Sequence, residues 1–220
     1  MMTLEEIAAQ EKRCSGTSWT RNAEFDKNGY IVIKDLCNPT ELLKPVPHQR
    51  GQISYWGQKV DQYVYEPEEH QVQGSLATYN RPDYRELHSV VRLKLEKLIG
   101  RPLYNTYYYD RFYWSGQELK KHADRDACEI SVTIHVGSSL ADPWPIWIKT
   151  PDSETEIGEE RSVLLQPGDA MLYKGCERPH WREAMPGNQQ PGLEDWHHQI
   201  FMHYVLQDGR RAHCAWDRGK

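Results

Sequence analysis

The stretch Leu119–His135, LKKHADRDACEISVTIH, is the part of the sequence around which we expect the rest of the chain to be organised. Over residues 128–136 apolar and polar residues alternate with a period of two, the pattern of a β-strand whose two faces meet different surroundings. His122 and Asp124 stand directly before this strand. Residues two apart in an extended segment point to the same side, so this pair can converge on one ion at the end of a strand.

The β character continues on both sides of this stretch. Short β-rich segments follow one another from LYNTYYYDRFYW at 103–114 to HHQIFMHYVLQ at 197–207. Turn signals separate them at Gly137-Ser138, Pro151-Asp152, Pro167-Gly168 and Pro186-Gly187-Asn188. Many short strands joined by such turns are typical of a sandwich or barrel, here of jelly-roll size, so we predict a mainly β fold.

The N-terminal part of the chain differs. Its clearest element is a helix over Arg81–Ile99, where apolar residues recur at helical spacing. We also expect a short helix within residues 1–22, a strand at Tyr30–Ile33 and a capped helix that begins near Asn38. Residues 45–80 show little periodicity and predict a long loop with one short strand at most, either a substrate lid or a surface insertion.

The length of 220 residues suits a single domain with a sizeable core. We expect that domain to combine a helical and loop-rich part at 1–102, which flanks the β core, with the core itself at 103–206. A polar tail at 207–220 is expected to be poorly ordered.

Charge and cysteine content narrow the class of protein. The net charge of −5 disfavours a general nucleic-acid or anionic-membrane binder, and there is no apolar run of 18 residues that would predict a membrane span. Five widely spaced cysteines without a CxxC motif argue against a disulfide or structural zinc framework, and we expect a cytoplasmic protein.

A third candidate ligand, His180, follows the segment GDAMLYKGCERP. A strand-turn-strand unit at 162–175 can bring it back to the end of the barrel that holds His122 and Asp124. Two histidines and one carboxylate with open positions are the ligand set of mononuclear non-haem Fe(II) oxygenases. The alternative is that HADRD is a solvated turn with no ligand role, because a histidine and an aspartate are often two residues apart by chance.

Three segments resemble the Fe(II)/2-oxoglutarate-dependent dioxygenase superfamily, in its prolyl-hydroxylase-like branch. They are RFYWSGQELKKHADRDACEISVTIHVG, PGDAMLYKGCERPHWREAMPG and FDKNGYIVIKDLCNPTEL. The resemblance covers about residues 24–45 and 81–206. It implies a double-stranded β-helix (jelly roll) with flanking N-terminal α-helices. It also implies an iron ion bound by His122, Asp124 and His180, with 2-oxoglutarate and O2 as co-substrates. The presence of Asp124 favours hydroxylation over halogenation.

The sequence departs from this family at the cation that holds the far carboxylate of 2-oxoglutarate. The family commonly places an arginine or lysine on the last strand, where this chain has Gln199. We expect Arg182 to take that role, since it lies two residues after His180; a surface pair with Glu177 or Glu183 is the alternative. Arg111, Lys149 and Arg161 are further possible substitutes.

Other residues are weaker candidates for the same pocket. Tyr107, Tyr109, Gln199 and His203 can line it as co-substrate contacts, and Trp144 and Trp147 as a substrate wall, although core packing explains each of them as well. Cys128 and Cys176 lie near the site in sequence, and a buried thiol acting as a small hydrophobe is the default for both. His197 and His198 are neighbours in a strand and therefore point to opposite faces. Arg210-Arg211 resembles the arginine pair of a nucleic-acid demethylase, which the acidic net charge disfavours.

Three functional hypotheses follow. The first is an iron- and 2-oxoglutarate-dependent hydroxylase of a prolyl or other amino-acid residue, with succinate and CO2 as co-products. The second keeps this chemistry but acts on a free small molecule. The third is a non-catalytic metal-binding jelly-roll module, motivated by the missing cation on the last strand. The substrate and the oligomeric state stay open at this point.

Overall fold

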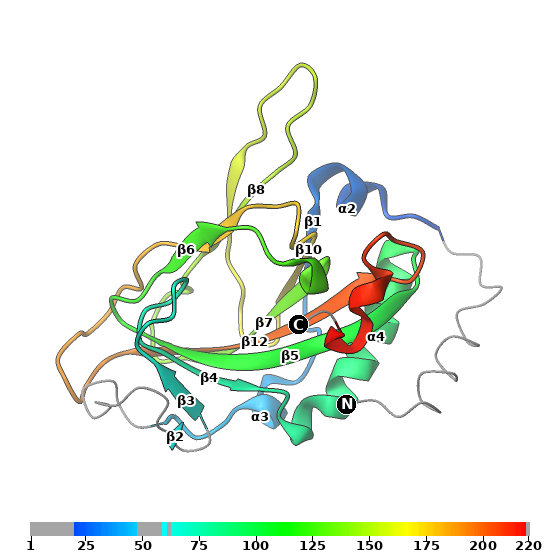
Figure 1. Ribbon diagram of the computed structural model, residues 1–220. Helices are drawn as coiled ribbons and strands as arrows, with labels where there is room; N and C mark the ends of the chain where they lie inside the picture. Colours follow the sequence, from blue (N-terminus) through cyan, green and yellow to red (C-terminus); the bar gives the residue numbers. More distant parts are fainter. Residues whose placement is uncertain (1–19, 48–58, 61–62, 219–220) are drawn as a thin grey trace.

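The structure is a computed structural model that describes residues 20–47, 59–60 and 63–218, with the backbone alone at 59–60. The helix expected within residues 1–22 lies almost entirely outside the described residues. Two antiparallel sheets lie one above the other, with the larger sheet below in Figure 1. Within the described residues, no helix is both long and apolar enough to cross a bilayer.

The larger sheet has eight strands in the order β1-β10-β7-β12-β5-β4-β3-β2. Their bounds in chain order are β1 Tyr30–Ile33, β2 Lys59–Val60, β3 Tyr63–Glu66, β4 Ser75–Tyr79, β5 Leu103–Trp114, β7 Ile130–Ser138, β10 Ala170–Tyr173 and β12 Trp196–Leu206. The smaller sheet has the order β6-β11-β8-β9, with β6 Leu119–His122, β8 Ile146–Lys149, β9 Glu160–Val163 and β11 His180–Arg182. This mainly β architecture confirms the predicted jelly roll.

Three α-helices and three 3-10 turns complete the described fold. The helices are α2 Ala23–Asn28, α3 Pro39–Leu42 and α4 Arg85–Ile99, and the turns are η2 Pro82–Tyr84, η3 Asp126–Cys128 and η4 Ala212–Asp217. The helix α3 begins where the sequence predicts, because the Asn38 side chain accepts a hydrogen bond from the Thr40 backbone N–H. The helix α4 ends at Gly100, whose φ of 66° is left-handed and where a Cβ would lie 2.1 Å from the Thr20 carbonyl oxygen.

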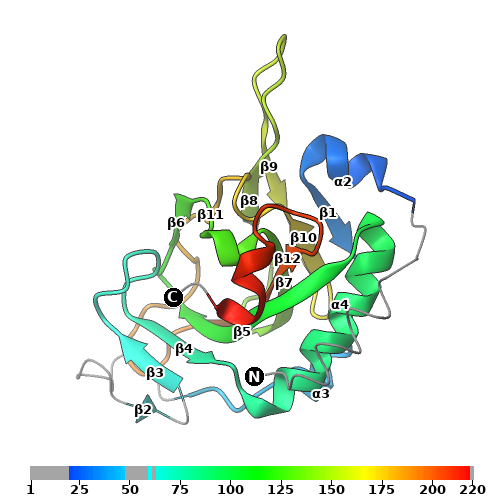
Figure 2. The same ribbon diagram turned by 45° about the vertical axis from the view of Figure 1, so that its right-hand side comes forward.

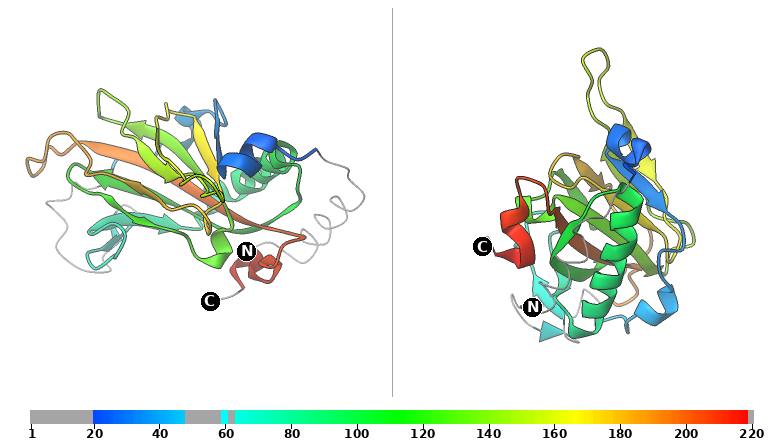
Figure 3. Two further views of the ribbon diagram at one scale, coloured as in Figure 1. Left: turned by 90° about the horizontal axis from the view of Figure 1, so that it is seen from above. Right: turned by 90° about the vertical axis from the view of Figure 1, so that its right-hand side faces the viewer.

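The two faces of the larger sheet have opposite characters. Helix α4 covers the outer face, as the right panel of Figure 3 shows, and its Val91, Leu95 and Ile99 join a core with Val132 and Ile134 of β7. The polar residues that alternate with these β7 residues face the interior between the sheets. The predicted strand pattern is therefore confirmed from Ile130 onward, with the apolar side turned to the helix and the polar side turned to the barrel interior. Cys128, which the same pattern included, belongs instead to the turn η3.

Two expectations from the sequence were wrong. Residues 63–79 form β3 and β4 instead of a loop, and Leu76 of β4 pairs with Phe112 of β5 with both side chains fully buried. The rest of the 45–80 segment includes 48–58 and 61–62, which lie outside the described residues. Short polar interruptions between the two strands hid their period from sequence reasoning.

The tail is the second correction. Residues 207–218 do not trail into solvent but return across the barrel end as η4, drawn in red at the front of Figure 2. The Trp216 ring packs on Tyr104 with 4.9 Å between ring centroids, and Asp217 pairs with Arg125 at 2.7 Å. Cys214 is buried as well, so a mostly polar composition concealed a small packed surface.

Candidate metal centre and the floor of the barrel

The two sheets bring the three predicted ligands together at one end of the barrel. His122 is the last residue of β6, His180 is the first residue of β11, and the two are direct partners in the antiparallel pair of these strands. The Nε2 atoms of His122 and His180 lie 3.5 and 3.6 Å from the same atom, Oδ1 of Asp124. We call these three residues the triad.

Both imidazole rings of the triad are held in the orientation that a metal requires. His122 Nδ1 lies 2.7 Å from the Lys120 carbonyl oxygen, and His180 Nδ1 lies 3.0 Å from the Arg178 carbonyl oxygen. A carbonyl only accepts hydrogen bonds, so each Nδ1 carries the proton and each Nε2 presents its lone pair to the centre of the triad. The backbone thus sets the tautomer of both candidate ligands.

Asp124 is positioned from behind by neighbouring strands. Its backbone N–H donates to the Gly175 carbonyl at 2.9 Å, and its Oδ2 accepts a hydrogen bond from Ser131 Oγ at 2.9 Å. Gly175 has to be glycine here, because a Cβ would lie 2.3 Å from Asp124 Oδ2.

Aromatic side chains close around the triad. Tyr109 stacks on Phe201 at 4.6 Å between ring centroids, and Tyr107 lies 4.6 Å from the ring of His203. Tyr109, Phe201 and His203 line the space beside the triad, which has a volume of about 10 Å³. Such a space holds about one water molecule, so binding of a larger ligand requires these side chains to move.

Arg182 and Gln199, both predicted from the sequence, meet inside the barrel on the side away from the triad. The Arg182 Nη2 donates to Gln199 Oε1 at 3.0 Å, and its Nη1 donates to the Trp144 carbonyl at 2.5 Å. Only 2% of Arg182 is exposed, and this burial lowers the pKa of the guanidinium to about 10. The surface pair with Glu177 or Glu183 is therefore not what the structure shows.

Around Arg182 lies a group of buried polar side chains that we call the floor cluster. Its members are Tyr113, His135, Arg182, His197 and Gln199. Several of their polar atoms have no hydrogen-bonding partner among the described residues: Arg182 Nε, Tyr113 Oη and His135 Nε2. Unpaired buried polar atoms are costly, so an arrangement with this many in one place is suited to a polar ligand.

Sequence reasoning did not select three members of the floor cluster, Tyr113, His135 and His197. The two histidines stack at 4.4 Å between ring centroids although they come from different strands, β7 and β12. The alternation of the strands contained a signal for the two histidines. His135 shares a strand face with Ser131, and His197 shares one with Gln199, so both were placed to point into the barrel. As predicted, His198 points to the opposite face, where its Nε2 lies 3.2 Å from Asp110.

The predicted tryptophan wall divides between two places. Trp144 is buried beside the floor cluster, with its ring 5.2 Å from Tyr113 and its Nε1 donating to the Glu183 carbonyl. Trp147 stacks on Trp181 at 6.0 Å, on the face of the smaller sheet opposite to His180. The structure therefore brings Trp144 into the barrel but not Trp147.

The three residues predicted as possible substitutes for Arg182 lie in different parts of the structure. Lys149 pairs with Asp152 and Arg161 with Glu159, both in exposed pairs away from the triad. Arg111 instead faces the interior, directly opposite Gln199 on the neighbouring strand, and is 2% exposed. Its Nη2 lies 3.6 Å from Glu69, whereas its Nε and Nη1 have no partner among the described residues.

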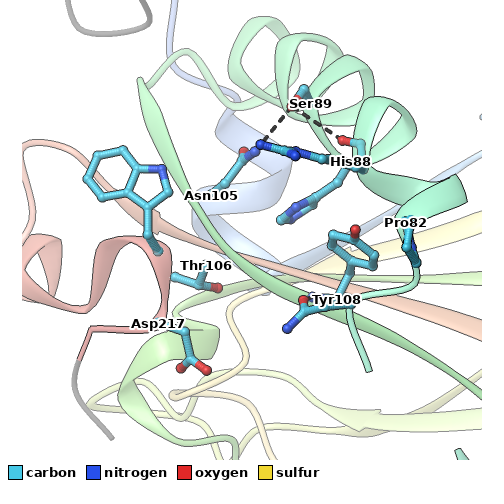
Figure 4. A pocket seen from close by; sticks show the side chains of 10 residues that line it. Pro82, His88, Ser89, Asn105, Thr106, Tyr108 and Asp217 are labelled. Atoms are coloured by element: carbon cyan, nitrogen blue, oxygen red, sulfur yellow. Dashed lines mark hydrogen bonds between the residues drawn. The ribbon is translucent and has the colours of Figure 1, made fainter. Parts of the chain in front are cut away.

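A larger pocket, about 390 Å³ in volume, lies beside α4 and β5. Figure 4 shows its polar lining, in which Asn105 donates to the Ser89 hydroxyl and the rings of His88 and Tyr108 lie close together. The Nε2 of His88 lies 3.1 Å from the backbone carbonyl of His203, whose side chain is on the triad side of the sheet. The pocket is thus separated from the triad by the sheet itself.

Comparison with known proteins finds similar solved structures but no similar sequence. No protein-family model matches the chain, and neither does any curated protein sequence. Among solved structures, a 2OG-Fe(II) oxygenase family oxidoreductase from Burkholderia pseudomallei is similar with a TM-score of 0.58 and 10% identity, over 89% of this chain and 91% of that one.

Two prolyl hydroxylases are similar as well. The prolyl-4-hydroxylase of Pseudomonas putida has a TM-score of 0.53 at 13% identity, over 82% of this chain and 95% of its own. A prolyl hydroxylase from Trichoplax adhaerens, solved with a hypoxia inducible factor peptide, has a TM-score of 0.51 at 12% identity, over 92% and 94%. This chain therefore shares the fold of the Fe(II)/2-oxoglutarate-dependent oxygenases, prolyl hydroxylases among them.

Proposed function

We propose that the protein is a non-haem Fe(II) and 2-oxoglutarate-dependent dioxygenase that hydroxylates a C–H bond. The observation that carries this proposal is the triad, in which two imidazole Nε2 atoms converge on one carboxylate oxygen. Two imidazoles and one carboxylate leave adjacent coordination positions open, which is the ligand set of oxygen-activating Fe(II) sites. The shared fold supports the same conclusion.

The residues of the triad fit an iron ion in their chemistry as well as their positions. His122 and His180 would each supply Nε2, held by a carbonyl at the opposite ring nitrogen, and Asp124 would supply Oδ1. Ser131 fixes the other carboxylate oxygen. Bound Fe(II) supplies the redox chemistry by which O2 oxidises 2-oxoglutarate to succinate and CO2 and the substrate C–H bond is hydroxylated.

The floor cluster fits the far carboxylate of 2-oxoglutarate. Arg182 lies two residues after His180 on β11, so both side chains point into the barrel, and its Nε has no partner among the described residues. The Tyr113 hydroxyl is likewise unpaired in a buried position. Arg182 would bind the carboxylate as a buried cation and Tyr113 would donate to it, and the remaining polar atoms would exclude an apolar ligand from this place.

The side chains that line the space beside the triad have to move before 2-oxoglutarate can bind there. The space of about 10 Å³ beside the triad is too small for a dicarboxylate, so Tyr109, Phe201 or Gln71 has to rotate when one binds. Gln71 follows Glu69, whose carboxylate accepts the backbone N–H groups of Gln71 and Val72. The Gln71 carbonyl also accepts a hydrogen bond from the Lys120 backbone N–H at 3.1 Å, so we expect the Gln71 side chain to move and its backbone to stay in place.

For the substrate we propose a prolyl or other amino-acid residue in a peptide. The structural similarity to prolyl hydroxylases, one of them solved with a peptide, favours this class. A free small molecule is the second candidate, favoured by how tightly aromatic side chains close the space beside the triad. A non-catalytic metal-binding module is the third, and the floor cluster argues against it because such a module has no need of unpaired buried polar atoms.

The decisive experiment is an anaerobic titration of the full chain with Fe(II) and then 2-oxoglutarate. Chelation of 2-oxoglutarate to Fe(II) is expected to give a visible charge-transfer absorption, and admission of O2 is expected to give succinate even without the prime substrate. Fe(II) binding without any absorption change and without succinate would leave only the non-catalytic module.

The anchor is tested with matched arginine variants. Arg182→Met should weaken 2-oxoglutarate binding at least about thirtyfold, equivalent to about 2 kcal/mol, because it removes the buried cation that meets the carboxylate. Arg161→Met, which removes an exposed arginine, should have no effect. If Arg111→Met weakens binding and Arg182→Met does not, the anchor is Arg111 and the assignment of Arg182 is wrong.

A further inference from the structure

A second group of ligand-type side chains adjoins the triad and has no part in the proposed reaction. It consists of Asp124, Cys128 and His203, each of which offers one ligand atom, and these three atoms lie within 4.8 Å of one another. Cys128 and His203 are each 2% exposed. They come from η3 and β12, so the fold brings together residues that are far apart in the sequence.

His203 is oriented toward this group and is incompletely paired. Its Nδ1 lies 2.9 Å from Ser131 Oγ, and its Nε2 has no partner among the described residues. The ring is buried, and a buried imidazole with an unpaired ring nitrogen is a donor for a metal ion.

Cys128 supplies a sulfur atom at the same place. Its Sγ lies 3.2 Å from the Tyr107 hydroxyl, and Tyr107 in turn packs on His203 at 4.6 Å between ring centroids. The thiol is therefore not enclosed by apolar atoms alone, as a sulfur that acts only as a small hydrophobe would be. Its neighbours are an oxygen, an imidazole and a carboxylate, which are the usual partners of a thiolate at a metal.

Asp124 can serve both groups because its two oxygens face different neighbours. Oδ1 lies between the two imidazoles of the triad, whereas Oδ2 is hydrogen-bonded to Ser131, the residue that also contacts His203. One carboxylate can bind two ions through its two oxygens. Occupancy of the second group would then alter the charge on the carboxylate that the triad uses.

We propose that Asp124, Cys128 and His203 form a second metal subsite that selects a thiophilic divalent cation such as Zn²⁺ and shares Asp124 with the triad. A mixed sulfur, nitrogen and oxygen donor set suits Zn²⁺ or Co²⁺ better than Mg²⁺ or Ca²⁺. The ion displaces the proton of the Cys128 thiol to solvent, and the sulfur–metal bond takes its place. The subsite does not depend on oxygenase activity, although its occupancy changes the triad.

The test is an anaerobic Co²⁺ titration of the full chain, read by the near-ultraviolet thiolate-to-Co(II) charge-transfer absorption. The wild-type chain should develop this absorption, and Cys128→Ser should lose it. Cys176→Ser is the matched control, because Cys176 is a nearby thiol whose Sγ donates to the Arg125 carbonyl outside the group; it should retain the absorption. His203→Ala should weaken Co²⁺ binding at this site at least about tenfold.

A double variant separates this proposal from the proposed function. In His122→Ala/His180→Ala the triad is lost, yet the thiolate absorption should persist because neither histidine belongs to the subsite. Absence of the absorption in the wild-type chain, or its persistence in Cys128→Ser, would overturn the subsite while leaving the Fe(II) and 2-oxoglutarate experiment unaffected. Circular dichroism of each variant establishes that it is folded.

Discussion

The triad and the floor cluster lie in the same barrel but differ in how far their polar atoms are hydrogen-bonded within the protein. In the triad every ligand is held by a second contact: carbonyls at Lys120 and Arg178 hold the two imidazoles, and Ser131 holds Asp124. In the floor cluster several buried polar atoms lack any partner among the described residues. The difference indicates that the triad is preorganised for the ion that we propose, whereas the floor cluster would be completed by the proposed ligand.

The largest effect is expected when a ligand of the triad is removed. His180→Ala should weaken Fe(II) binding at least about 100-fold, since only one imidazole and one carboxylate remain. Isothermal titration under anaerobic conditions measures this affinity. The exposed His213→Ala is the control and should bind Fe(II) as the wild-type chain does; unchanged affinity in His180→Ala would remove His180 from the ligand set.

A smaller effect is expected when the support of the triad is disturbed. Gly175→Ala places a Cβ 2.3 Å from both Asp124 Oδ2 and the Cys128 carbonyl, so the chain must shift, at a cost of about 1–3 kcal/mol in the free energy of unfolding. Iron affinity should fall with it.

Gly137→Ala is the matched control for this change. Its added Cβ would meet the end of the Leu43 side chain at 3.2 Å, which can move aside. Urea unfolding of the two variants gives the comparison. Equal stability of Gly175→Ala and Gly137→Ala would mean that the close approach to Asp124 does not constrain the triad.

The floor cluster should make the stability of the ligand-free protein depend on pH. Burial, together with the charge of Arg182 and the neighbouring His135, lowers the pKa of His197 well below 6.5. The unfolded chain therefore binds a proton on His197 below pH 6.5 that the folded chain does not, so stability is lost as the pH falls. At pH 5.5 this amounts to about 1.4 kcal/mol relative to pH 7.5.

Urea midpoints at the two pH values measure this loss for the wild-type chain and for His197→Gln. The variant should lose less stability on acidification, because glutamine does not titrate in this range. His213→Gln removes an exposed histidine and should keep the wild-type pH dependence. A His197→Gln protein with an unchanged slope would show that His197 is not protonated differentially on unfolding.

The smallest effect is expected for Tyr113→Phe, and it tests most directly the difference between the triad and the floor cluster. Tyr113→Phe removes a buried hydroxyl without a partner, so the ligand-free protein should be as stable as the wild type or more stable by up to about 1 kcal/mol. The same change should weaken 2-oxoglutarate binding by about threefold to tenfold. Loss of stability together with unchanged ligand binding would assign Tyr113 to packing alone.

The same contrast explains how much the sequence predicts. The spacing made His122 and Asp124 a candidate pair at the end of a strand with a clear period, but the resemblance of the surrounding segments to the Fe(II)/2-oxoglutarate-dependent dioxygenases was needed to single out these two residues and His180 as a set. The jelly roll itself followed from this pattern of short strands and turns.

The floor cluster could not be predicted in the same way. Tyr113, His135 and His197 lie on three strands, and each on its own reads as a core residue, since their convergence depends on the register of β5, β7 and β12. Arg182 was found only because it shares a strand with His180. The ordered tail escaped prediction for a related reason, because its contacts with Tyr104 and Arg125 join segments about a hundred residues apart.

Strand β11 carries both a proposed metal ligand, His180, and the proposed anchor, Arg182, only two residues apart on one backbone. Trp144 and Gln199 hold the guanidinium in place. A strand that fixes both ends of the proposed co-substrate in this way would admit dicarboxylates of one chain length and reject those a carbon shorter, without any residue that recognises the middle of the molecule.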